Sequence, residues 1–178
     1  PKGTGFLYIS EKMKIVPIIY GGGQQKGMRS GTDNVPGIAG LGLASKMVYD
    51  HLEENVNHMY DLRAYFVGEL EKMDQVVVHG PYGEAAAPQI VSAAFVGVRS
   101  EVLLHTLEER DIYVSAGSAC STHKRSGRPT LTAIGLPKNQ MEATVRFSFC
   151  ETTTKEELDY TLQVLNEVVP MLRRYARH

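Results

Sequence analysis

The stretch VRFSFCETTTKEEL, residues 145–158, contains the end of one element and the start of another. Residues Val145 to Phe149 alternate apolar and polar side chains, which is typical of a half-buried strand. Residues Thr154 to Glu157 have the pattern Thr-x-x-Glu, a capping box that begins a helix. The apolar face of that helix would be Leu158, Leu162, Leu165 and Val169. A strand followed at once by an amphipathic helix indicates a domain of mixed α and β structure.

Shorter elements surround this stretch. Strands are predicted at residues 5–9, 76–79, 90–96 and 112–114. Pro17 removes a backbone donor, so residues 15–20 are expected to be an irregular or edge segment. Ser100 is predicted to be the N-cap of a helix, and residues 129–134 to form a helical turn closed by Gly135. Mixed elements without an internal repeat predict an α/β or α+β fold.

One long segment is helical in pattern. From Pro36 to Met73, apolar residues recur at spacings of three, four or seven, the stripe of an amphipathic helix. Nearly forty residues is long for one helix of a globular protein. We therefore expect a kink or a break within it.

The composition excludes several classes of protein. The 178 residues carry 19 Lys and Arg against 20 Asp and Glu, a net charge of −1, which offers no basic patch for nucleic acid or an anionic membrane. Cys120 and Cys150 are too few for a disulfide scaffold and too far apart for a CxxC metal pair. A reduced, cytoplasmic setting is the expectation. The six histidines show no metal spacing, so no metal site is predicted.

A lone thiol lies among small residues in Ser115–Thr122. No large side chain is present there to bury Cys120, so the thiol is placed to react rather than to pack. The alternative is a small apolar residue in a tight turn. His123 and Lys124 would lower the pKa of this thiol, or they are solvated surface residues. Cys150 follows a strand and is predicted to pack.

The loop Gly21–Thr32 is rich in glycine, and Arg29, Ser30 and Thr32 are potential donors to an anion. It matches neither of the common nucleotide-binding glycine motifs, so phosphate binding and a plain connection both stay open. Arg146 should lie on the face of its strand opposite Val145 and Phe147. It is either a surface residue or an arginine that holds a carboxylate in a bidentate manner.

Taken together, four motifs resemble those of the cysteine desulfurases that supply sulfur for iron–sulfur clusters and tRNA thiolation. They are Pro1–Tyr8, Gly21–Gln25 with Arg29–Thr32, Ser115–Cys120 and Val145–Ser148. The resemblance implies the C-terminal part of a fold-type-I, pyridoxal-phosphate-dependent transferase with an α+β small domain. Residues 1–50 would be a remnant of the large cofactor-binding domain, including the glycine-rich phosphate loop. Residues 51–178 would be the small domain that carries the catalytic cysteine.

The resemblance also implies roles for three residues. Cys120 would be the nucleophile that takes the sulfur of L-cysteine as a persulfide and leaves alanine. Arg146 would bind the substrate carboxylate, and Thr32 would reach the phosphate of pyridoxal phosphate across a homodimer. A sulfur-acceptor protein, either an iron–sulfur scaffold or a tRNA-thiolation enzyme, would be the partner. Gln25 stands where the family often has an acidic residue.

The family's cofactor lysine lies just before the segment that resembles Pro1–Gly5. This chain begins too late to contain it, and the chain alone is expected to be inactive. Two alternatives stay open. One is a class V aminotransferase-like enzyme without persulfide chemistry. The other is a non-catalytic module that carries sulfur or binds a partner.

Overall fold

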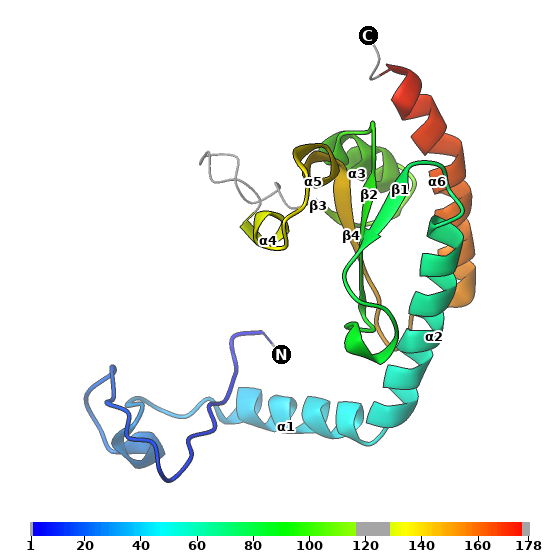
Figure 1. Ribbon diagram of the computed structural model, residues 1–178. Helices are drawn as coiled ribbons and strands as arrows, with labels where there is room; N and C mark the ends of the chain where they lie inside the picture. Colours follow the sequence, from blue (N-terminus) through cyan, green and yellow to red (C-terminus); the bar gives the residue numbers. More distant parts are fainter. Residues whose placement is uncertain (1, 117–128, 176–178) are drawn as a thin grey trace. The chain divides into compact units, whose positions relative to one another are not determined.

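The computed structural model describes residues 2–116 and 129–175 (Figure 1). The chain divides into two compact units, residues 1–52 and 53–178, which we describe separately. Within the described ranges, no helix has both the length and the apolar character that a bilayer-spanning helix needs.

The first unit contains η1 (Gln24–Gly27) and α1 (Val35–Tyr49). Asn34 caps α1, because its side chain accepts a hydrogen bond from the Gly37 amide at 3.1 Å. The strand predicted at residues 5–9 is wrong: this segment has no regular structure, and Phe6 is 83% exposed. A strand needs a neighbour to pair its backbone groups, and the described part of the first unit contains no strand.

The long helical segment is broken, as predicted. α1 ends at Tyr49, and α2 (Leu52–Leu70) begins three residues later. Only α2 buries an apolar stripe, which is Leu62, Phe66, Val67 and Leu70. The periodic pattern thus continues through the break, but only its second half packs on a core within its own unit.

Four strands of the second unit form one antiparallel sheet in the order β1-β2-β4-β3. Their bounds are β1 (Val76–His79), β2 (Ile90–Phe95), β3 (Ser115–Ala116) and β4 (Thr144–Ser148). The strand predicted at residues 112–114 is displaced to β3. The Ile112 amide bonds back to the carbonyl of Leu107, so the segment before Ser115 forms the return from the preceding helix.

The other elements are η2 (Gly83–Ala85), α3 (Ser100–Glu108), α4 (Pro129–Ala133), α5 (Lys138–Ala143) and α6 (Lys155–Tyr175). The prediction that Ser100 is the N-cap of α3 is wrong. Arg99 occupies the cap position with extended backbone, and Ser100 is the first helical residue, buried to 1% exposure. The predicted turn at residues 129–134 is confirmed as α4.

The core lies between the sheet and three helices, α2, α3 and α6 (Figure 1). Alternate residues of β2 and β4 face these helices, and Phe66 of α2 lies at the centre with no exposed surface. Its ring packs edge-on against Phe147 and Phe149, with ring centroids 5.0 and 5.7 Å away. Edge-to-face pairs of this kind orient the helix as well as burying area.

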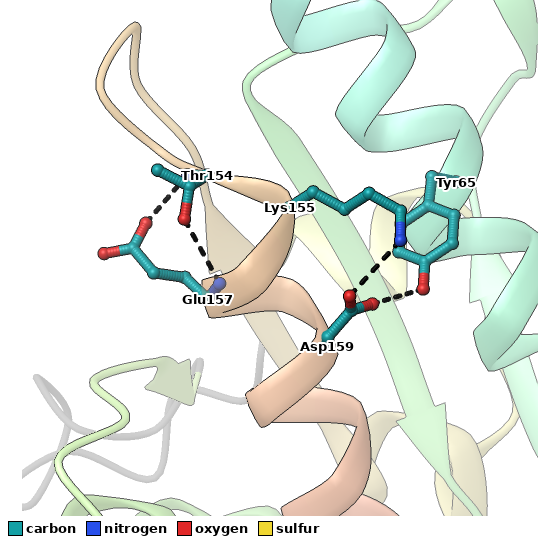
Figure 2. A network of polar contacts seen from close by, with 5 residues as sticks. All are labelled: Tyr65, Thr154, Lys155, Glu157 and Asp159. Atoms are coloured by element: carbon teal, nitrogen blue, oxygen red, sulfur yellow. Dashed lines mark hydrogen bonds and ion pairs between the residues drawn. The ribbon is translucent and has the colours of Figure 1, made fainter.

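The capping box at the start of α6 is confirmed (Figure 2). The Glu157 amide donates to Thr154 Oγ1 at 3.2 Å, and the Thr154 amide donates to Glu157 Oε2 at 2.8 Å. One turn further, Asp159 accepts a hydrogen bond from the Tyr65 hydroxyl of α2 and pairs with Lys155 at 3.2 Å. The hydrogen bond from Tyr65 lowers the pKa of Asp159. These contacts attach the first turn of α6 to α2.

Candidate active site

A row of polar side chains crosses the second unit's sheet from one edge to the other. In the strand register, His79 pairs with Ser92, Ser92 with Arg146, and Arg146 with Ser115. Directly paired residues of antiparallel strands point to the same face. The four side chains therefore share the face opposite the apolar core.

Arg146 is the charged member of the row. It is exposed, and it lies opposite Val145 and Phe147, as its alternation with them predicts. Its Nη2 donates to Ser115 Oγ at 3.4 Å, and within the described ranges no carboxylate forms an ion pair with it. A guanidinium without a counter-ion keeps donors for a planar, bidentate ligand such as a carboxylate. The structure does not test which ligand it binds, so its role stays a prediction.

His79 ends the row at the β1 edge, and sequence reasoning missed it. Its side chain is buried, with Nε2 3.1 Å from Thr144 Oγ1. The Thr144 hydroxyl donates its single proton to the Gln140 carbonyl at 2.6 Å, so we assign the Nε2 proton to His79. Burial lowers the pKa of His79. His79 is therefore a neutral imidazole that is hydrogen-bonded to Thr144 at the β1 end of the row. In the sequence, its one signal is that a polar residue ends an apolar strand.

Ser115 and Ala116 form the short strand that leads toward the predicted nucleophile. Cys120, His123 and Lys124 lie outside the described residues, so the role predicted for Cys120 stays a prediction. Residue 116 is paired with Val145, the neighbour of Arg146. The chain thus enters the cysteine segment from a strand that is paired with the arginine's strand.

The glycine-rich loop of the first unit is closed by its own polar groups. The hydroxyl of Ser30 is buried and donates to the Gly22 carbonyl at 2.7 Å, so this predicted donor is used by the loop itself. The Gly31 amide donates to Gln24 Oε1 at 3.2 Å. Thr32 is exposed at the end of the loop. Thr32 belongs to the first unit and Arg146 to the second.

Cys150 is exposed, and the prediction that it packs is wrong. β4 ends at Ser148, and Phe149 takes the buried position instead. The thiol lies 3.2 Å from Thr152 Oγ1, and hydrogen bonding by Thr152 lowers its pKa. This side chain is therefore an accessible thiol, which any test of Cys120 must control for. Within the described residues, no group of three potential metal ligands gathers.

Comparisons with known proteins give consistent results. A family model described as "Aminotransferase class-V" matches residues 1–161. The chain is 37% identical over 174 residues to a "Cysteine desulfurase IscS" of Dictyoglomus turgidum, covering 97% of this chain and 44% of the relative. It is 36% identical over 176 residues to a protein of the same name from Methanosarcina thermophila, covering 99% of this chain and 43% of the relative.

Among solved structures, a "NIFS-LIKE PROTEIN" superposes with a TM-score of 0.81 at 34% identity, covering 93% of this chain and 42% of that one. The expected fold-type-I class, with an α+β small domain, agrees with this match and with the observed antiparallel sheet. The chain spans less than half the length of the relatives that it matches.

Proposed function

This chain belongs to the class V aminotransferase family, and from that premise we propose that the full-length protein is a cysteine desulfurase that converts L-cysteine to L-alanine. The support is sequence identity of 36–37% to proteins named cysteine desulfurase, along 97–99% of this chain. The proposal concerns the full-length protein because this chain spans about 44% of such a relative. Residues 1–50 would belong to its large domain, and residues 51–178 would form its small domain.

The observation that carries the proposal is the pairing of Ser115 with Arg146. It puts a guanidinium that has no ion pair within the described ranges next to the strand that precedes the segment with Cys120. Cys120 lies four positions after Ala116, and such a length of chain spans at most about 14 Å. A carboxylate held by Arg146 and a thiol within that reach are two of the groups that transfer of sulfur from an amino acid requires.

In this function each residue has a distinct task. Arg146 would hold the α-carboxylate of L-cysteine through its free guanidinium donors. The thiolate of Cys120 would attack the substrate sulfur, forming a sulfur–sulfur bond as the carbon–sulfur bond breaks; the electron pair stays with the substrate carbon, which takes up a proton to give alanine. The persulfide on Cys120 would then pass its outer sulfur to an acceptor protein, for iron–sulfur cluster assembly or tRNA thiolation. We place this activity in the cytoplasm, where thiols stay reduced.

Pyridoxal phosphate, when bound, supplies the electron sink for cleavage of the carbon–sulfur bond. The residues of the first unit fit one part of this group, its phosphate. The side chains of Gln24 and Ser30 bond to backbone groups of the loop, and the side chain of Gln25 donates to Asp33. Thr32 presents an exposed hydroxyl at the end of the loop. A hydroxyl with this freedom can donate to a phosphate oxygen. We propose that Thr32 does so for the cofactor of the partner subunit in a homodimer.

The test is sulfide release and alanine formation from L-cysteine by the full-length protein with its cofactor and a thiol reductant. Cys120→Ala should abolish persulfide formation and lower sulfide release at least a hundredfold. Cys150→Ala is the matched control, because that thiol is exposed and its pKa is lowered. It should keep the wild-type rate.

Four outcomes would contradict the proposal. The nucleophile assignment is wrong if Cys120→Ala keeps its rate or if Cys150→Ala loses it. Transfer of the amino group of L-cysteine, with neither alanine nor sulfide or persulfide formed, would favour a class V enzyme that lacks persulfide chemistry. No turnover of L-cysteine by the full-length protein would leave the sulfur-carrier module as the better reading.

A further inference from the structure

Ser115 holds a particular place in the polar row. It lies in β3, a strand of two residues at the edge of the sheet, and its direct partner in the register is Arg146. The distance from Arg146 Nη2 to Ser115 Oγ is 3.4 Å. Within the described ranges, this is the side-chain hydrogen bond that the structure shows for the guanidinium.

Arg146 needs such a partner because its side chain is long, flexible and exposed. Binding a carboxylate in a bidentate manner requires one orientation of the planar guanidinium. One hydrogen bond from Nη2 reduces the rotation of the group while Nε and Nη1 keep their donors for a ligand. A side chain oriented before binding loses less conformational entropy when the ligand arrives.

The other neighbour of Arg146 does not serve this purpose. Ser92 pairs with Arg146 from the opposite side, in β2, and it is half-buried. The hydrogen bond of the arginine goes to Ser115 at the open edge instead. The guanidinium is thus held on the side of β3, the strand that leads to Cys120.

We propose that Ser115 is a positioning residue, whose hydroxyl orients the Arg146 guanidinium for the α-carboxylate of the amino-acid substrate. This inference rests on the proposed function and deepens it, since it names the group that sets the affinity for substrate. It predicts an effect on binding of the carboxylate and little effect on the chemical step.

The test uses the full-length protein with its cofactor and three variants. Ser115→Ala should raise KM for L-cysteine about threefold to tenfold, the usual net contribution of one ordinary hydrogen bond, with kcat within twofold. Ser115→Thr retains a hydroxyl on a strand and should return KM to within twofold of wild type. Ser148→Ala is the matched control, since Ser148 is an exposed serine two residues from Arg146 on the same face. It should change neither constant.

A second readout separates positioning from chemistry. L-alanine carries the same carboxylate but has no sulfur, so its inhibition constant should rise by the same factor as KM in Ser115→Ala. The urea midpoint of this variant should match that of the Ser148→Ala control, which shows that the fold is unchanged.

The results distinguish this inference from the proposed function. If Arg146→Ala raises KM strongly while Ser115→Ala leaves KM and the alanine constant unchanged, Ser115 has no positioning role and the function stands. A fall in kcat of Ser115→Ala with constant KM also overturns the inference. If Arg146→Ala itself leaves KM unchanged, the carboxylate assignment fails, and the inference fails with it.

Discussion

Replacing Thr154 by alanine tests how the second unit is held together at the start of α6. This helix has 21 residues, and seven of them are buried in the unit. The backbone amides of its first turn have no partners within the helix. The capping box gives two amides a partner, because the side chain of Thr154 accepts from the Glu157 amide and the side chain of Glu157 accepts from the Thr154 amide. Thr154→Ala removes the hydroxyl that accepts from the Glu157 amide at 3.2 Å.

The expected loss is about 1 kcal/mol of unfolding free energy, within a range of roughly 0.5–2 kcal/mol for alanine at an N-cap. The unit comprises residues 53–178. Domains of that size gain about 0.26 kcal/mol per degree in unfolding entropy, so the melting temperature should fall by about 4 °C. Urea unfolding followed by helical circular dichroism measures the free energy directly. Thr154→Ser keeps the hydroxyl and should stay within about 0.5 kcal/mol of wild type.

Lys155→Ala is the comparison that decides which interaction matters in this turn. Lys155 pairs with Asp159 and lies 4.3 Å from the centre of the Tyr65 ring (Figure 2). The pair is exposed, and a cation in the first turn opposes the helix dipole. We expect no measurable change in the urea midpoint. The reasoning is refuted if Thr154→Ala matches wild type or if Lys155→Ala costs as much as Thr154→Ala.

Three further changes have distinct expected outcomes. Phe66→Leu keeps an apolar side chain but loses two edge-to-face contacts, which should cost about 1–3 kcal/mol in urea unfolding; a loss below about 0.5 kcal/mol would contradict the assigned packing. Burial lowers the pKa of His79 below that in the unfolded chain, so as the pH falls the unfolded chain binds this proton before the folded protein does. The free energy of unfolding should therefore be constant above about pH 6.5, decrease as the pH falls below 6.5, and become constant again below the pKa of His79 in the folded protein. His79→Gln should remove this decrease in stability below pH 6.5 in urea unfolding. If the pH dependence of the unfolding free energy is the same in the variant, His79 does not cause it. In a Cys120→Ser background, Thr152→Val should slow alkylation of Cys150 near neutral pH, since the pKa of that thiol returns toward its ordinary value; an equal rate would show that Thr152 does not lower the pKa.

The features that could be predicted from the sequence depend on neighbours along the chain. The capping box joins residues three apart, and its bonds are the ones expected. The face of β4 that carries Arg146 follows from alternation alone, because successive strand residues point to opposite faces. The break between α1 and α2 follows from length.

The features that could not be predicted depend on partners far away in the chain. The expected strand at residues 112–114 is displaced because β3 exists only where Arg146 and Val145 pair with it. A strand was also expected at residues 5–9, where the described first unit has no strand to pair with it. Cys150 is exposed because the chain turns after β4. The alternating apolar residues of β4 do not predict this turn.

The candidate site divides along the same line. The sequence by itself predicted the candidate chemical groups, the thiol of Cys120, the guanidinium of Arg146 and the loop hydroxyl of Thr32, because residue type and motif order carry that information, and the roles of these residues stay predictions. Only the tertiary structure decided that Ser115 and His79 share a face with Arg146. That neighbourhood arises from strand register, which is set by packing of the whole sheet on its helices and leaves no trace in local spacing.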